Sequence, residues 1–475
     1  MWAAVRGREP PANYFLPLSH RKSPDYPLPA GRQYGATGSV VAGSVLLVKE
    51  ACDNGGWSTV DRGLTPCGVR AACEKEPVMN NTTFVGMDVH KNEHVVAVYV
   101  PGTEEPEVFS VSHRPAEIRK LAQRLLGLAP GPIVACYEAG VLGFSLKRQL
   151  EGWKIPCRVI APSLIPVQPG QRVQTDYRDA RKLGWYLRAG MLTEVQAPDE
   201  AQEGVRDLCR WRHSAQRDLI RVRHQVTKFL LRRGLVYRDG SHWTGKHHQW
   251  LRVQKVADPV GQEVYEAMLV ELDHRQERVK GLDVRMEEVA RQAPYREPVG
   301  WLCCLRGVKT VTALSIVSEL YGIERFGTAG GLMSYLGLTP SVMSSGLSTV
   351  HGGITKAGNV RVRRLLVEAS WHQIHSPVTS RVLAKRREGQ PAWAVTVAKK
   401  AQMRLHRRYW SLVHKGKSPG KAVTAVAREL VGFVWAMLRL KDQAAPGDGP
   451  AASRGRRGLA SAGAGAKKKE TAVVQ

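Results

Sequence analysis

The fold of the first ordered region is decided by the stretch FVGMDVHKNEHVVAVYV, residues 84–100. FVGMDVH and HVVAVYV both have the composition of β-strands, and the polar residues KNE lie between them. Two such runs joined by a short polar turn predict a β-hairpin. The stretch therefore indicates that an ordered domain begins near Phe84 with two antiparallel strands.

Helical and strand patterns alternate after this hairpin. We expect helices at residues 115–128, 143–153 and 176–191, and buried strands at residues 132–140 and 156–162. Strands that alternate with helices after an initial hairpin are typical of an α/β layer sandwich with a mixed sheet. This part of the chain therefore predicts one α/β domain.

The charge of the 475-residue chain indicates a polyanionic partner. Lys and Arg number 70 against 42 Asp and Glu, a formal net charge of +28, which gives the surface a strongly positive field. No window approaches the roughly 18 to 20 apolar residues of a spanning helix, and the N-terminus lacks a signal-peptide pattern. We therefore expect nucleic acid rather than membrane as the partner, and a cytoplasmic protein that is nucleoid-associated when bound to DNA.

The eight cysteines are scattered, and Cys303 and Cys304 form the only close pair. This spacing suggests neither a disulfide framework nor a zinc site. GVKT at residues 307–310 lacks the earlier glycine of a phosphate-binding P-loop, so ATP dependence is not predicted.

Composition divides the chain into five segments. Residues 1–78 show no sustained period and read as a disordered or wrongly assigned extension, and residues 442–475 are a basic tail too poor in apolar residues to fold. Between them we expect the α/β domain at 79–197 and a mostly α-helical domain at 299–441. The intervening residues 198–298 contain two long runs with apolar steps of three and four, which predict a helical coiled-coil or oligomerisation region.

Four carboxylates are candidates for a metal site. Asp88 lies at the end of the first strand, Glu138 ends a later buried strand, and Asp176 and Asp179 share one face at the start of a helix. Four carboxylates at one point repel one another unless cations lie between them, and Mg²⁺ suits such oxygen ligands. Each acid alone has an ordinary structural interpretation, and Asp176 in particular could serve as a helix cap.

The same residues lie in motifs that resemble those of the DEDD transposases of the insertion-sequence one-ten family, relatives of the Piv invertases. The matching pieces cover roughly residues 84–440 and are GMDVHK (86–91), YEAG (137–140), TDYRDARKL (175–183), RF (325–326), YLGLTPS (335–341), SSG (344–346) and GGITKAGNVRVRRLL (352–366). The resemblance implies an RNase H-like (RuvC-like) domain whose Asp88, Glu138, Asp176 and Asp179 bind Mg²⁺ or Mn²⁺. It also implies that translation could start at Met79 instead of Met1.

The resemblance assigns Ser345 as the nucleophile that attacks a DNA phosphate, with Ser344 as the neighbouring alternative. It further implies a structured noncoding guide RNA encoded by the element, and DNA as both donor and target. The segment 307–326 is similar to the family's helix-hairpin-helix-like part but departs from it at Val308-Lys309-Thr310. Together with the apolar steps of three and four residues within residues 198–298, which form a heptad pattern, these implications predict a homo-oligomer, a dimer or a tetramer.

Basic residues close to the serine are candidates for nucleic-acid contacts. Lys356, Arg361, Arg363 and Arg364 follow a glycine-rich approach, and phosphate binding is their expected role. A second basic surface is expected on the first long helix and a third at residues 385–408.

The sequence therefore predicts an insertion-sequence transposase that cleaves DNA and exchanges strands. A RuvC-like junction or structure-specific endonuclease and a site-specific DNA invertase remain alternatives, as does a non-catalytic nucleic-acid-binding protein. In a purely hydrolytic enzyme, a metal-activated water would replace Ser345.

Overall fold

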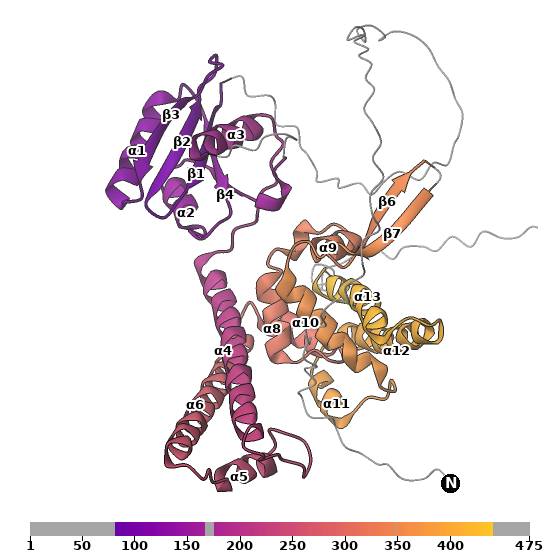
Figure 1. Ribbon diagram of the computed structural model, residues 1–475. Coiled ribbons are helices and arrows are strands. Elements are labelled where there is room, and N and C mark those ends of the chain that lie inside the picture. Colours follow the sequence, from indigo (N-terminus) through magenta and orange to yellow (C-terminus); the bar gives the residue numbers. More distant parts are fainter. Residues whose placement is uncertain (1–80, 167–174, 347, 440–475) are drawn as a thin grey trace, which may run out of the picture. The chain divides into compact units, whose positions relative to one another are not determined.

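The computed structural model describes residues 81–166, 175–346 and 348–439 (Figure 1). The expected N-terminal extension, the alternative start at Met79 and the expected tail lie outside the described residues. By the density of their contacts, the described residues form two units, one of residues 221–273 and one of residues 81–220 with 274–439. None of the described helices is long and apolar enough to cross a membrane.

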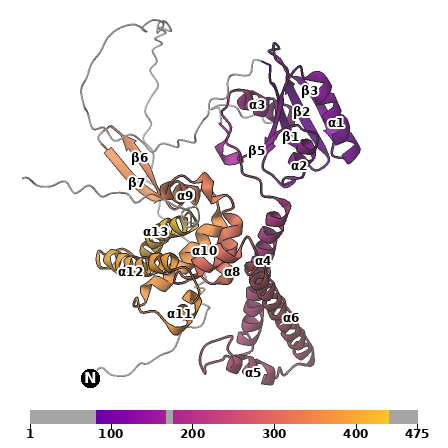
Figure 2. The same cartoon turned by 180° about the vertical axis from the view of Figure 1, so that it is seen from behind.

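A five-stranded mixed sheet in the order β3-β2-β1-β4-β5 forms the first part of the larger unit. Its strands are β1 (Thr83–Val89), β2 (Glu93–Tyr99), β3 (Glu107–Ser112), β4 (Ile133–Glu138) and β5 (Cys157–Ile160). The central strand β1 runs antiparallel to β2, with Asp88 opposite Val95, and parallel to β4, with Met87 opposite Tyr137. β5 lies at the sheet edge (Figure 2), followed by the short 3-10 turn η1 (Pro162–Leu164).

Helices cover both faces of this sheet. Alternate strand residues such as Val85 and Met87 pack against α1 (Pro115–Leu128) and α2 (Ser145–Gly152). The opposite side chains pack against α3 (Asp176–Arg188), whose Ala180 and Leu183 are buried. This strand order with helices on both faces is consistent with an RNase H-like domain.

The structure confirms the predicted hairpin and each strand and helix expected between residues 115 and 191, within a few residues at their ends. The sequence interpretation missed β3, the edge strand EVFSVS. Among the strands that the structure describes, β3 pairs with β2 alone and is half-exposed, so its residues lack the buried apolar pattern that marked the other strands.

Two 32-residue helices follow, α4 (Glu200–Leu231) and α6 (Pro259–Ala290). In the unit of residues 221–273, the rings of Phe229 and Tyr265 stack with centroids 5.8 Å apart. The Tyr265 hydroxyl donates to the Leu251 carbonyl of α5 (Gly245–Val253), the helix that lies between α4 and α6 in the sequence. Pairing of these helices with another subunit stays a prediction.

The remaining described residues are mostly helical, as predicted. The elements are α7 (Arg296–Cys303), α8 (Thr310–Glu319), η2 (Ile323–Arg325), α9 (Ala329–Tyr335), β6 (Pro340–Ser345), β7 (Ser348–Ile354), α10 (Val360–Ser370), η3 (Trp371–Ile374), α11 (Arg381–Arg387), α12 (Ala392–His414) and α13 (Pro419–Arg439). Fully buried side chains of α8, α10, α12 and α13, among them Leu314, Leu366, Leu405 and Leu430, share one core. The sequence interpretation missed the two-stranded sheet of β6 and β7, whose residues are almost all exposed.

Two glycines of the matching motifs hold the base of this hairpin. Gly337 and Gly358 both have positive φ, and a Cβ on Gly358 would lie 1.7 Å from the Tyr335 carbonyl oxygen. A Cβ on Gly337 would lie 2.4 Å from the Ala357 nitrogen. Both positions therefore need glycine, because the chain before β6 packs directly on the chain after β7.

Candidate active site and nucleic-acid contacts

The four candidate carboxylates come from three neighbouring elements of the larger unit. Asp88 is on β1 and Glu138 ends the adjacent parallel strand β4, while Asp176 and Asp179 are in the first turn of α3. Within the described part of the chain, the carboxylates of Glu138 and Asp179 have no hydrogen bond or ion pair. No described hydrogen bond or ion pair therefore explains these two acids, although the charge of Lys182 attracts Glu138.

Two glycines let α3 approach β1 closely enough to bring these acids together. A Cβ built on Gly86 of β1 would lie 2.2 Å from the backbone nitrogen of Gly184 on α3 and 2.3 Å from the Ala180 carbonyl oxygen. A Cβ on Gly184 would in turn lie 2.6 Å from the Tyr99 ring. The glycine of GMDVHK thus permits a backbone-to-backbone contact that larger residues exclude.

The cap of α3 is Thr175 and not Asp176. The Thr175 hydroxyl accepts a hydrogen bond from the Arg178 backbone N–H at 3.4 Å, and Asp176 is the first helical residue. The Asp176 side chain is 60% exposed, so its carboxylate is available to a ligand. A cap function therefore does not account for Asp176.

The charges of the acids act on one another. Burial raises the pKa of Asp88, His90 opposes this shift, and the negative charges of Asp176 and Asp179 raise the pKa further. Partial desolvation raises the pKa of Glu138, and the charges of Asp88 and Asp179 add to the increase. A divalent cation among these groups would relieve the repulsion and favour all four charged forms.

His90 belongs to the same cluster, although the sequence interpretation did not single it out. Its Nε2 atom lies 3.3 Å from Asp88 Oδ2 and 3.6 Å from Asp176 Oδ1. One donor atom from each of these three residues lies within 4.8 Å of the others. The spacing of Asp88 and His90 in the sequence could have indicated this neighbour, because side chains two residues apart in an extended chain point to the same side.

The donors fit a hard divalent cation. Carboxylate oxygens are the preferred ligands of Mg²⁺, and one imidazole beside them is compatible with Mn²⁺. Asp88, Glu138, Asp176 and Asp179 are the residues that would hold such ions.

Ser344 and Ser345 lie at the tip of the β6–β7 hairpin. Ser345 is opposite Ser348 and Ser344 is opposite Thr349, and all four side chains are exposed. Successive strand residues point to opposite faces, so only one of the two serines can face a given ligand. The described interactions do not join either serine to the four carboxylates.

The candidate phosphate-binding residues have different surroundings. Lys356 and Arg361 are exposed, and Arg364 is half-buried, with its guanidinium 2.9 Å from His213 Nδ1. Arg363 is buried and donates to the carbonyls of Leu336 and Ala357. The expected phosphate contact by Arg363 is therefore not supported, because its guanidinium holds the motif loops together inside the protein.

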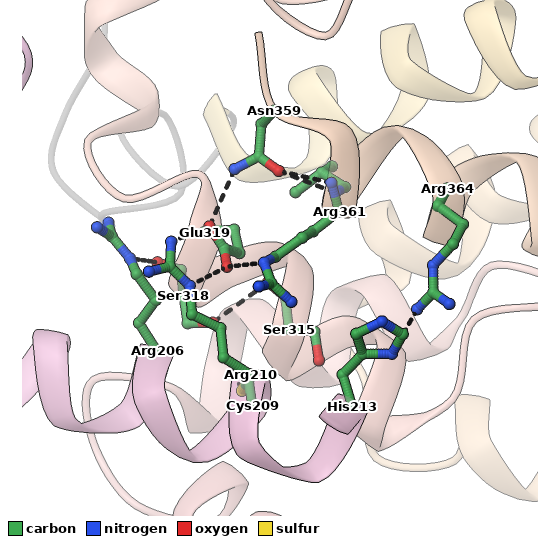
Figure 3. Close-up of polar contacts among 11 residues, drawn as sticks. Arg206, Cys209, Arg210, His213, Ser315, Ser318, Glu319, Asn359, Arg361 and Arg364 are labelled. Atoms are coloured by element: carbon green, nitrogen blue, oxygen red, sulfur yellow. Dashed lines mark hydrogen bonds and ion pairs between the residues drawn. The ribbon is translucent and has the colours of Figure 1, made fainter. Parts of the chain in front are cut away.

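A buried carboxylate orients the helix that carries these arginines (Figure 3). Glu319 is 4% exposed, and Arg210 of α4 donates to both of its oxygens at 2.8 and 3.1 Å. The Asn359 side chain donates to Glu319 at 2.9 Å and also caps α10 by accepting from the Arg361 and Val362 backbone N–H groups. These ion pairs and hydrogen bonds hold the Glu319 pKa below its ordinary value, although burial acts to raise it.

The histidine of this junction is neutral at pH 7. Burial and the positive charges of Arg364, Arg361, Arg217 and Arg212 lower the pKa of His213 to about 4. Neutral His213 can accept a hydrogen bond from Arg364 through Nδ1. The excess of arginines over acids around it gives this surface a positive potential.

Comparisons with known proteins agree with this arrangement. Residues 85–233 match the DEDD transposase model of the IS110 group, and residues 301–383 match the Transposase IS116/IS110/IS902 family. A putative transposase, y4qE, of Sinorhizobium fredii is 37% identical over 361 residues, 75% of this chain and 88% of the relative. The transposase for insertion sequence element IS1533 of Leptospira borgpetersenii is 33% identical over 344 residues, 71% of this chain and 99% of the relative. The chain therefore belongs to the IS116/IS110/IS902 family of DEDD transposases.

Proposed function

We propose that this protein is the transposase of an insertion sequence and that Asp88, Glu138, Asp176, Asp179 and Ser345 carry its DNA cleavage and strand exchange. The supporting observation is that the charges of these four carboxylates, which come from β1, β4 and α3, act on one another in a chain of a DNA-cleaving and rejoining family.

The carboxylates would bind two divalent ions, Mg²⁺ or Mn²⁺. When bound, such ions would supply Lewis-acid chemistry, polarising a phosphate and stabilising the attacking and leaving oxygens. Asp88 and Asp176 are on neighbouring elements and each offers a donor atom within 4.8 Å of the other, so both would hold such an ion. The Gly86 contact with α3 fixes the separation of the two elements.

Ser345 would act as the nucleophile. Its Oγ attacks the phosphorus of a DNA phosphodiester, forms a P–Oγ bond and expels one DNA oxygen as a free hydroxyl, to which the serine proton is transferred. Attack by another strand's hydroxyl then restores a phosphodiester and returns the proton to Ser345. The covalent intermediate conserves the bond energy, so that rejoining needs no ATP.

Exposed cations would position the nucleic acid. Lys356 and Arg361 follow the hairpin that carries Ser345, and Arg364 lies one turn further along α10. Contacts to phosphates fix the register of a duplex without reading its sequence. We infer that sequence choice belongs to a structured noncoding RNA of the element, in keeping with a basic chain that has no zinc-finger or homeodomain pattern.

A homo-oligomer, a dimer or a tetramer, is part of the proposal. The apolar steps of three and four residues in α4 and α6 support it, because helices with this pattern pair with each other or with another subunit.

Excision and insertion in cells test the function. We expect Asp88→Asn and Glu138→Gln to abolish both events, because each variant removes a negative ligand without changing side-chain size. Glu117→Gln is the matched control, since Glu117 is on α1 and its carboxylate contacts only Lys120 among the described residues. Intact excision and insertion in both site variants would favour a non-catalytic nucleic-acid-binding protein.

The second candidate is a RuvC-like nuclease that hydrolyses DNA junctions with water. The cluster of Asp88, His90 and Asp176 favours it, because hydrolysis by a metal-activated water needs no serine. A denaturing gel separates the two: the transposase forms a protein–DNA adduct that Ser345→Ala abolishes, whereas a nuclease forms none and is unaffected by Ser345→Ala.

A further inference from the structure

We propose that His90 is a ligand of the carboxylate metal site and that its imidazole gives the site a preference for Mn²⁺ over Mg²⁺. This inference rests on the proposed function, because it requires that Asp88 and Asp176 bind a divalent ion.

The geometry of the three donors suits a single ion. Ligands of an octahedral ion at about 2.1 Å are about 3 Å apart when adjacent and about 4.2 Å apart when opposite. His90 Nε2 lies 3.3 Å from Asp88 Oδ2 and 3.6 Å from Asp176 Oδ1, and the three donors lie within 4.8 Å of one another. Shifts of well under 1 Å would therefore place all three around one ion.

The backbone holds His90 in this place. Its N–H donates to the Glu93 carbonyl at 3.2 Å, a bond that closes the β1–β2 hairpin. The ring is 54% exposed and lies beside Asp88, which is only 21% exposed. The imidazole, like the 60% exposed Asp176 side chain, is therefore accessible to an ion from solvent.

The chemistry of imidazole predicts the preference. Mg²⁺ selects oxygen donors and retains its water, whereas first-row transition metals accept nitrogen readily. A site of carboxylates alone discriminates weakly between Mg²⁺ and Mn²⁺. One added nitrogen ligand strengthens Mn²⁺ binding and does little for Mg²⁺.

Removal of the ring should therefore affect the two ions differently. In His90→Ala we expect the Kd for Mn²⁺ to rise by about tenfold or more, while the Kd for Mg²⁺ changes by less than about threefold. His224→Ala is the matched control, because His224 is an exposed histidine of α4 and is not part of the carboxylate cluster.

The full-length protein is titrated with MnCl₂ and with MgCl₂ in a calorimeter, and the Mn²⁺ complex is examined by electron spin echo spectroscopy. The proposal expects a ¹⁴N modulation from a bound imidazole in the wild type and in His224→Ala, and its loss in His90→Ala. Circular dichroism confirms that each variant is folded.

Two results would overturn the proposal. A wild-type Mn²⁺ spectrum without ¹⁴N coupling means that His90 is not a ligand. Equal or tighter binding of both ions by His90→Ala means that His90 is an ion-pair partner that the metal displaces.

The metal site itself is tested by Asp88→Asn. Mn²⁺ binding that requires Asp88 but not His90 refutes only the role of His90. If the wild-type protein binds neither Mn²⁺ nor Mg²⁺, or if Asp88→Asn leaves the binding of both ions unchanged, the proposed metal site is refuted as well.

Discussion

The closest packing near the candidate active site gives the sharpest structural prediction, the effect of Gly86→Ala. The new methyl group would lie 2.2 Å from the Gly184 nitrogen and 2.3 Å from the Ala180 carbonyl oxygen, whereas an ordinary contact begins near 3.4 Å. Both neighbours are backbone atoms of α3, so a side-chain rotation cannot relieve the clash. Helix α3 must therefore move away from β1 by about 1 Å.

This movement has two measurable costs. Overpacking of a well-packed contact costs about 1 to 3 kcal/mol, which corresponds to about fivefold to 150-fold faster hydrogen exchange of the β1 and α3 amides. The same movement carries Asp176 and Asp179 away from Asp88 and Glu138. We expect divalent-ion binding to weaken by about tenfold or more, as when a supporting group of a metal site is lost.

Hydrogen exchange read by mass spectrometry and metal titration by calorimetry measure both effects. Gly127→Ala is the control: Gly127 is on α1 and a Cβ there has no neighbour within 4 Å, so alanine should be neutral or stabilise the helix by about 0.5 to 1 kcal/mol. Wild-type exchange and wild-type metal affinity in Gly86→Ala would refute the account of how α3 and β1 build the site.

Three further predictions concern the junction of α4, α8 and α10. Glu319→Gln breaks a buried ion pair and should lower the free energy of unfolding in urea by about 3 kcal/mol, near the lower end for buried pairs because Arg210 is 42% exposed. The exposed control Glu288→Gln should cost less than about 0.5 kcal/mol, and equal effects of the two variants would contradict this role for Glu319. The lowered pKa of His213 predicts that its contribution to stability is complete above pH 6.5 and falls as the pH drops from 6.5 to about 4, because the unfolded chain takes up the proton first. An NMR titration of the His213 ring that gave an ordinary pKa would exclude this pH dependence. The double variant Lys356→Ala, Arg361→Ala should reduce the slope of the logarithm of the DNA-binding constant against the logarithm of salt concentration by about 1.8, which corresponds to two lost phosphate contacts on duplex DNA. Arg363→Ala should leave this slope unchanged and destabilise the fold, and a reduced slope in Arg363→Ala would instead show that Arg363 contacts phosphate.

The sequence predicted the sheet where strands are buried or strictly patterned. The β1–β2 hairpin and β4 have runs of buried apolar residues that only a strand explains at that length. The edge strand β3 is only partly buried and the hairpin of β6 and β7 is almost fully exposed, so neither has a run of fully buried apolar residues. No periodicity marks such strands.

The elements that carry the four candidate acids were predictable from the sequence, but the surroundings of these acids were not. Strand ends and a helix start located Asp88, Glu138, Asp176 and Asp179, because the topology of a layered domain brings those positions to one edge. The inclusion of His90 depends on the hairpin turn, and the close approach of α3 depends on Gly86 and Gly184 together. These are contacts across the fold, which local spacing does not encode.

Charge patterns also fail to tell surface cations from buried ones. Arg361, Arg363 and Arg364 are nearly adjacent in the sequence, yet the helix turns Arg363 inward to two backbone carbonyls and leaves Arg361 exposed. Because an α-helix has 3.6 residues per turn, Arg361 and Arg363, two residues apart, point to different sides of α10. Only the packing of α10 against the neighbouring loops shows which face is buried.

Identification of the covalently modified residue tests the central claim most directly. The wild-type protein is incubated with element-end DNA, its RNA and Mg²⁺ or Mn²⁺, digested with nuclease and protease, and sequenced by mass spectrometry. We predict that a nucleotide phosphate is found on Ser345 of the wild-type protein and that none is found on Ser345 of the Asp88→Asn variant. A phosphate on Ser344 or on another residue, or cleaved DNA without any adduct, would contradict the proposed mechanism.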